Sequence, residues 1–229
     1  MLFTLFWVSL LLGLPNFGVS GSFHLEQARD EFGIRSHGIV ETSGAKQIKF
    51  YALPQSTSEQ YRRLRPEDLR INPFPPKLYQ RQEVIGPYQV IAGRLWFGNN
   101  YYHGEGMRGV GAFGYFDTIA RRYTLYSPPE VAPYEISAIL VQPHQVWLGL
   151  DQFGEDTARA PGGLAHWNSS THATLRYPLE FVVTDIRQQG GSLRLQTADG
   201  YALFNNGEVR RFLENGKPIS RFAPSPSHY

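Results

Sequence analysis

Short apolar stretches, each bounded by turn-forming residues, run along most of the chain. Four of them follow one another in the second half of the sequence, at residues 135–141, 145–149, 163–167 and 174–177. Pro143-His144 lies in the first gap and Asn168-Ser169-Ser170 in the last, and both contain residue types that favour turns. Short runs with such boundaries are typical of β-strands. The stretch 136–146 is mostly apolar, which indicates a strand buried on both faces.

This pattern repeats along the chain. Residues 88–126 align without a gap on residues 139–177, an offset of 51. Identical residues fall at Val90 and Val141, Trp96 and Trp147, Gly98 and Gly149, Arg108 and Arg159, Gly111 and Gly162, and Tyr126 and Tyr177. A shorter copy follows at 184–204, and a fainter one at 38–54 resembles the second half of the unit. We expect Trp96 and Trp147, which share one position of the repeat, to be core residues.

Four short strands in a repeat of 40–50 residues are typical of a β-propeller blade. The sequence therefore predicts an all-β protein, a β-propeller of four-stranded blades. It has about four blade-like repeats, and the ring is either incomplete or closed by terminal strands. The repeats are expected at about 23–54, 84–129, 135–180 and 181–213.

A family resemblance adds to this prediction. The segments Val146-Trp147-Leu148-Gly149 and 161–168 (PGGLAHWN), followed by Arg176-Tyr177, resemble the two-component-regulator propeller repeat. The resemblance covers residues 88–212 and, faintly, 23–54. Such repeats build the periplasmic sensor propellers of hybrid histidine kinases, so the resemblance implies the fold without implying one function. No kinase segment follows the repeats, and we expect a small or partial propeller without a kinase part.

The first residues form a separate segment. Residues 1–14 are apolar and uncharged but shorter than the roughly 20 residues of a membrane helix. Val19-Ser20-Gly21 offers small residues for signal-peptidase cleavage before Ser22. Because no Lys or Arg precedes the apolar run, an uncleaved anchor and a buried N-terminal element stay open as alternatives. We expect a signal peptide at 1–21, a single domain at 22–222 with a Pro-rich insertion at 55–83, and a disordered tail at 223–229.

Charge and composition exclude some classes of partner and site and indicate the cellular compartment. The formal net charge is +2, from 22 Lys and Arg against 20 Asp and Glu, so we expect no nucleic-acid partner. The chain has no Cys, which excludes disulfides, thiolate metal sites and Cys nucleophiles. We expect a periplasmic or secreted protein, without stable membrane insertion after the signal peptide is removed.

Candidate binding residues follow the second strand of two repeats, in stretches that look like long loops. A rigid scaffold that presents loops is a common place for binding sites. The predicted ligand-binding residues are Asn99, Asn100, Tyr101, Tyr102, His103, Glu105, Asp151, Gln152, Glu155 and Asp156. Aromatic rings, amides and carboxylates together suit a protein or glycan ligand, because rings stack while amides and acids bond hydroxyls.

Catalytic patterns are weaker. Asp151, Glu155 and Asp156 lack the spacing of an EF-hand loop, the seven His show no metal-ligand spacing, and no G-x-S-x-G motif occurs. We therefore expect no catalytic residues, no metal and no cofactor, and a non-catalytic binding module as the function. Two alternatives remain: a propeller enzyme acting on a glycan or lactone-type substrate, with Glu105 and Asp151 as an acid–base pair, or a structural interaction subunit. The ligand, ring closure and oligomeric state stay open.

Overall fold

The computed structural model describes residues 22–25, 28–30, 33–35, 38–53, 83–103, 106–107, 111–151 and 162–219. The predicted signal peptide, nearly all of the Pro-rich insertion and the predicted tail lie outside the described residues. The strands are β1 (Ser22–Leu25), β2 (Ala28–Asp30), β3 (Gly33–Arg35), β4 (Gly38–Ser43), β5 (Lys46–Ala52), β6 (Glu83–Ile91), β7 (Arg94–His103), β8 (Gly106–Met107), β9 (Ala112–Asp117), β10 (Arg122–Tyr126), β11 (Glu135–Gln142), β12 (Gln145–Asp151), β13 (Gly163–Asn168), β14 (Thr174–Tyr177), β15 (Asp185–Gln189), β16 (Ser192–Thr197), β17 (Gly200–Asn205) and β18 (Glu208–Leu213).

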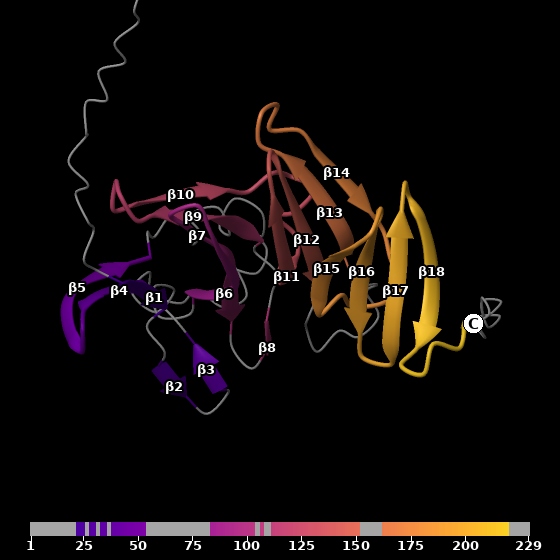
Figure 1. Cartoon of the computed structure of the whole chain (residues 1–229), viewed down its shortest axis with the longest axis horizontal. Helices are drawn as coiled ribbons and strands as arrows, with labels where there is room; N and C mark the ends of the chain where they lie inside the picture. Colours follow the sequence, from indigo (N-terminus) through magenta and orange to yellow (C-terminus); the bar gives the residue numbers. More distant parts are fainter. Residues whose placement is uncertain are drawn as a thin grey trace, which may run out of the picture.

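The strands form four consecutive antiparallel sheets, which we call blades. Blade 1 has the order β1-β4-β5, blade 2 β10-β9-β7-β6 with β8 beside β7, blade 3 β11-β12-β13-β14 and blade 4 β15-β16-β17-β18. The strands β2 and β3 pair only with each other among the described residues. Figure 1 shows the blades following one another, with blade 1 (indigo) and blade 4 (yellow) at opposite ends. The predicted all-β fold of propeller blades is confirmed: blades 2, 3 and 4 each contain the four expected strands, and blade 1 has three strands among the described residues.

Tight turns join the first two strands of blades 2, 3 and 4. They are the dipeptides Ala92-Gly93, Pro143-His144 and Gly190-Gly191. The backbone φ is positive at Ala92 (48°), His144 (62°) and Gly190 (57°). A positive φ at a central residue lets the chain reverse its direction within two residues. The turn predicted at Pro143-His144 therefore fixes the pairing of β11 with β12.

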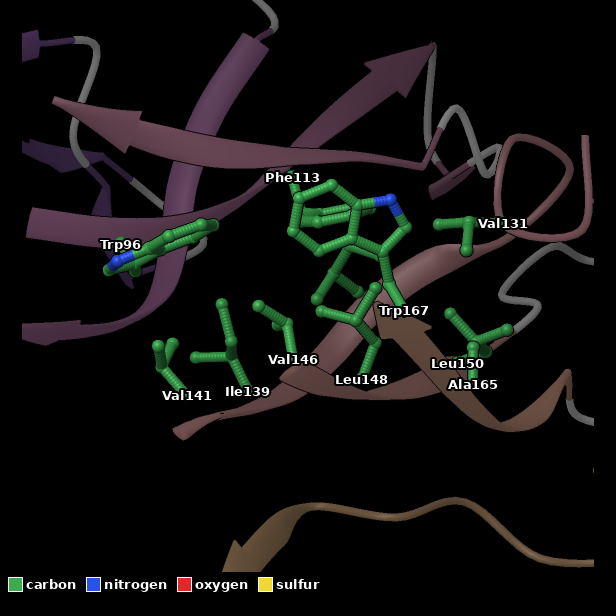
Figure 2. Packing of buried hydrophobic residues seen from close by; sticks show 11 residues of the cluster. Trp96, Phe113, Val131, Ile139, Val141, Val146, Leu148, Leu150, Ala165 and Trp167 are labelled. Carbon is green, nitrogen blue, oxygen red and sulfur yellow. The ribbon is translucent and has the colours of Figure 1, made fainter. Parts of the chain in front are cut away.

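The blades pack face to face through apolar cores. The core between blades 2 and 3 is centred on Trp167, which is almost fully buried. Its ring lies 4.5 Å from Tyr126, 5.2 Å from Phe113 and 6.3 Å from Trp96 between ring centroids. Figure 2 shows Trp167, Phe113 and Trp96 together with aliphatic residues of β11 and β12. A second core joins blades 3 and 4, and a third joins blades 1 and 2.

The two Trp residues at the shared repeat position lie in successive cores. Trp96 is buried between blades 2 and 3, as predicted. Trp147 is half-buried against the core between blades 3 and 4, where its ring lies 5.6 Å from Phe204. Each blade thus directs this residue toward the blade that follows it.

An ion pair ties blade 1 to blade 2. Arg121, in the turn between β9 and β10, donates to both carboxylate oxygens of Glu41 at 3.2 and 2.7 Å. Tyr51 donates to the same carboxylate at 2.7 Å, and Tyr123 of blade 2 donates to the Tyr51 carbonyl at 2.6 Å. The bond from Arg121 and then that from Tyr51 hold the pKa of Glu41 below its usual range. This buried carboxylate is therefore fully hydrogen-bonded across the interface.

Candidate functional site

The structure corrects the position of the first predicted loop. Asn99 and Asn100 lie inside β7 and are buried, where the sequence predicts a loop. The strand continues through Tyr101, Tyr102 and His103, because its backbone pairs with β6 as far as Tyr101 and then with β8. Of the other predicted binding residues, Asp151 is described, whereas Glu105, Gln152, Glu155 and Asp156 lie outside the described residues.

Asn100 joins two blades. Its amide nitrogen donates to the carbonyls of Gly86, in its own blade, at 3.0 Å and of Ile136, in blade 3, at 2.9 Å. Its side-chain oxygen accepts the backbone N–H of Ile136 at 2.8 Å. These three bonds fully engage a side chain that is only 4% exposed. Asn100 therefore fixes where β11 begins, and through it the position of the neighbouring residue, Glu135.

Glu135 and Asp151 form a carboxyl pair at one end of blade 3. They lie directly opposite each other, at the first residue of β11 and the last residue of β12. Opposite residues in an antiparallel pair have Cβ atoms about 4.5–5.5 Å apart. We call this end of the blades, where first strands begin and second strands end, the Glu135 end.

The Glu135 carboxyl holds its proton near neutral pH. Burial raises the pKa of Glu135 to about 8, and the negative charge of Asp151 adds to the increase. The Oε2 atom of Glu135 is buried and has no hydrogen-bond partner within the part of the chain that the structure describes. A protonated carboxyl beside a second carboxyl group offers both a donor and acceptors. This arrangement suits a ligand that carries hydroxyl or amide groups.

The sequence indicates Asp151 as a site residue but does not indicate Glu135. Extending the two-residue turn at Pro143-His144 in regular register would place Ile136 opposite Asp151. A bulge between Ile136 and Ala138 shifts the register by one residue and brings Glu135 into that place. The hydroxyl of Ser137, the extra residue, donates to the Val183 carbonyl at 2.8 Å at the boundary with blade 4. A charged residue at the start of an otherwise apolar strand was the available signal.

An aromatic side chain precedes the pair. Tyr134 is half-buried in the segment that joins blade 2 to blade 3, and the Arg176 guanidinium lies 5.1 Å from its ring centroid. Arg176 also donates to the Gly162 carbonyl at 2.9 Å, which holds the guanidinium at this end of blade 3. Within the described residues, no three His, Asp or Glu side chains gather closely enough to hold a metal ion. The described residues also contain no helix long and apolar enough to cross a membrane.

Comparison with known proteins gives structural similarity only. No protein-family model and no curated protein matches the chain. The extracellular domain of a one-component system from B. thetaiotaomicron matches 85% of the chain at 11% identity and a TM-score of 0.28, and the chain spans about a third (34%) of that domain's length. The Pan2 WD40 domain of Neurospora crassa matches 80% of the chain at 6% identity and a TM-score of 0.26, with 79% of that domain covered.

The fold assignment rests on the strand order of the chain itself. Four successive antiparallel sheets with sequential strand order, packed face to face, are the blades of a β-propeller. The class of protein is therefore β-propeller.

Proposed function

We propose that the chain is an exported, non-catalytic binding module that recognises a protein or a glycan through the Glu135 end of its blades. The observation that carries this proposal is the half-buried Glu135 carboxyl beside Asp151, whose buried Oε2 atom has no hydrogen-bond partner among the described residues. A buried polar atom without a partner is rare in native structures, and a ligand hydroxyl or amide would satisfy it. Export follows from the predicted signal peptide. The narrower relationship to two-component-regulator repeats is part of the same proposal.

Placement on paired strands makes the site rigid. Asn100 fixes the start of β11 through three hydrogen bonds, and Asp151 is held by the ladder between β11 and β12. Sites built on strands hold their geometry more closely than sites built on loops. The proposal also includes the predicted binding residues Glu105, Gln152, Glu155 and Asp156, which lie outside the described residues.

The test is a glycan array probed with the labelled protein, followed by titration of the best-binding glycan. Glu135→Gln and Asp151→Asn should each weaken binding at least tenfold, because each changes the donors and acceptors that face the ligand. Glu208→Gln is the matched control, since Glu208 begins β18 at the opposite end of blade 4 and is exposed. If all three variants bound the glycan as tightly as the wild-type protein does, the binding site would lie elsewhere.

One observation favours an enzyme as the second candidate. A carboxyl group whose pKa lies near 8 is protonated at neutral pH and could donate a proton to a glycosidic oxygen. In that case Glu135→Gln would retain glycan binding and lose turnover, and the wild-type rate would fall as the pH rises through about 8. Reducing-sugar release from the array-identified glycan separates the two functions.

A further inference from the structure

Two arginines occupy the same position in blades 3 and 4. Arg176 on β14 lies directly opposite Ala165 of β13, and Arg211 on β18 lies directly opposite Ala202 of β17. Each alanine is buried in the core that its blade shares with the preceding blade. Residues opposite each other in an antiparallel pair lie on one face of the sheet. Both arginines therefore lie on the face toward the preceding blade, at the Glu135 end, where third strands begin.

Each of these arginines lies over an aromatic ring. The guanidinium of Arg176 is 5.1 Å from the ring centroid of Tyr134, and that of Arg211 is 4.8 Å from the ring centroid of Phe181. Tyr134 and Phe181 belong to the segments that lead into β11 and β15. Stacking on a ring restricts a guanidinium and leaves its N–H donors pre-organised. Blades 3 and 4 thus hold their arginine in the same way.

The arginine of blade 4 is paired with a carboxylate. The Nη2 atom of Arg211 donates to both carboxylate oxygens of Asp199, at 3.0 and 2.7 Å. The hydroxyl of Thr197 donates to one of the same oxygens at 2.8 Å. Asp199 directly precedes Gly200, the first residue of β17. The carboxylate that Arg211 binds is therefore supplied by the residue before the third strand.

The corresponding residue of blade 3 is Gly162, which has no side chain. It directly precedes Gly163, the first residue of β13, as Asp199 precedes Gly200. A Cβ added to Gly163 or to Gly200 would lie 2.2 or 2.1 Å from a carbonyl oxygen of the fourth strand, so the two third strands begin alike. A Cβ added to Gly162 would lie 2.5 Å from the ring of Tyr134. Blade 3 therefore cannot place a carboxylate here without moving that ring.

Arg176 keeps N–H donors that a ligand could use. Its Nη1 atom donates to the Gly162 carbonyl at 2.9 Å, and no Asp or Glu of the described ranges forms an ion pair with it. The planar fork of a guanidinium matches a carboxylate. Tyr134, on which Arg176 lies, directly precedes Glu135 in the chain. The free donors are thus at the same end of blade 3 as the carboxyl pair.

We propose that Arg176 binds the carboxylate of an acidic sugar, so that the ligand of the Glu135 end is a glycan containing uronic acid. This inference rests on the proposed function and narrows its ligand. A uronic acid carries one carboxylate and several hydroxyl groups. The carboxylate would pair with Arg176 as Asp199 pairs with Arg211, and the hydroxyl groups suit Glu135 and Asp151. A peptide with closely spaced acidic residues fits less well, because its charges would also approach Asp151.

NMR of the arginine side chains tests the carboxylate site. The full-length protein, labelled with 15N-arginine, is titrated with sodium galacturonate or glucuronate, and with galactose or glucose, which carry CH2OH in place of the carboxylate. The Nε–H signal of Arg176, assigned with Arg176→Lys, should shift saturably with the acids and at least tenfold less with the neutral sugars. The Arg211 signal should not respond, because Asp199 fills that site. Asp199→Gly gives blade 4 the residue of blade 3 and should make Arg211 respond.

Arg194 is the control for general attraction of anions. Its guanidinium lies 3.6 Å from the ring centroid of Tyr201, on the sheet of blade 4 and away from its Glu135 end. Equal shifts of the Arg194 and Arg176 signals would mean that any stacked arginine attracts the acids, and would overturn the proposal. An Arg176 signal that stays unchanged with both acids would also overturn it. A Glu-containing peptide that shifts this signal more than the sugars do, at equal carboxylate concentration, would assign the site to acidic peptides.

Oligosaccharides separate this inference from the proposed function. Uronic-acid oligosaccharides and their carboxyl-reduced forms are compared for binding to wild type, Arg176→Gln and Arg210→Gln, a control at an exposed residue of β18. Wild type and Arg210→Gln should prefer the acidic forms at least tenfold, and Arg176→Gln should lose that preference. Equal binding of both forms, weakened only by Glu135→Gln, would overturn the acidic-sugar inference and support the proposed function. An Arg176 response to free uronic acids without binding of any glycan would support the carboxylate site and overturn the proposed function.

Discussion

Replacing Glu135 by Gln should stabilise the protein, and the gain should depend on pH. Gln has nearly the shape of a protonated Glu and cannot ionise, so it keeps the neutral form that burial favours. The pKa of Glu135 is raised from 4.5 to about 8 in the folded protein. A raised pKa means that the folded state binds the proton more tightly than the unfolded state does. The stability linked to that proton is complete below pH 4.5 and is lost as the pH rises through about 8.

The size of the gain follows from the pKa difference. Between pH 4.5 and pH 7 each pH unit removes about 1.4 kcal/mol from the wild-type free energy of unfolding, which gives about 3 kcal/mol at pH 7. Typical domains have roughly 5–15 kcal/mol in total, so this is a large effect. It corresponds to a Tm increase of roughly 6–12 °C for a chain of this size.

Urea unfolding followed by Trp fluorescence at pH 4.5, 7 and 8.5 measures the gain. Wild type and Glu135→Gln should be nearly equal at pH 4.5 and diverge at higher pH. Asp151→Asn removes only the smaller cause of the shift and should give a partial effect. Glu208→Gln, at an exposed residue, should leave the curves unchanged. A difference between wild type and Glu135→Gln that is absent, or the same at all three pH values, would refute the conclusion that Glu135 is buried in its neutral form.

Three further predictions concern the scaffold and the leader. Trp167→Ala should lower the free energy of unfolding by about 3–5 kcal/mol in chemical denaturation, because it empties the centre of the core between blades 2 and 3; a loss under about 1 kcal/mol would contradict that packing. Glu41→Gln should lower Tm at pH 7 because it weakens the contact between blades 1 and 2. Since the pKa of Glu41 is lowered in the folded protein, the Tm difference between wild type and variant should shrink as the pH falls below 4.5. A Tm difference that does not depend on pH would contradict the ion pair. N-terminal sequencing of protein from the native host should begin near Ser22, and an intact Met1 in soluble protein would contradict export.

Local chemistry explains why the strands could be predicted. The four strands expected between residues 135 and 177 are present as β11 to β14, with at most two residues added at the end of any of them. Short apolar stretches, the Pro143-His144 turn and the repeated Trp and Gly positions are properties of neighbouring residues in the chain. A strand pattern and a two-residue turn need no distant partner to be recognised.

The same local signals gave the wrong element at Asn99 and Asn100. Asn favours turns in isolation, so the sequence predicts a loop there. In the structure Asn100 makes three hydrogen bonds that join blade 2 to the start of β11. A partner 36 residues away outweighs the local preference because its bonds satisfy the whole amide in a buried place.

By itself the sequence determined the all-β class, the four blade-like repeats, the turns and the Trp positions, because periodicity and turn chemistry are local. Tertiary structure alone decided which carboxyl groups meet and which apolar side chains stay exposed. The bulge at Ser137 moves Glu135 opposite Asp151, and Tyr88 and Val90 of β6 are exposed where Ile139 and Val141, at the same repeat positions of β11, are buried. Both depend on strand register and on packing between blades, where a shift of one residue changes which side chains meet and which are buried.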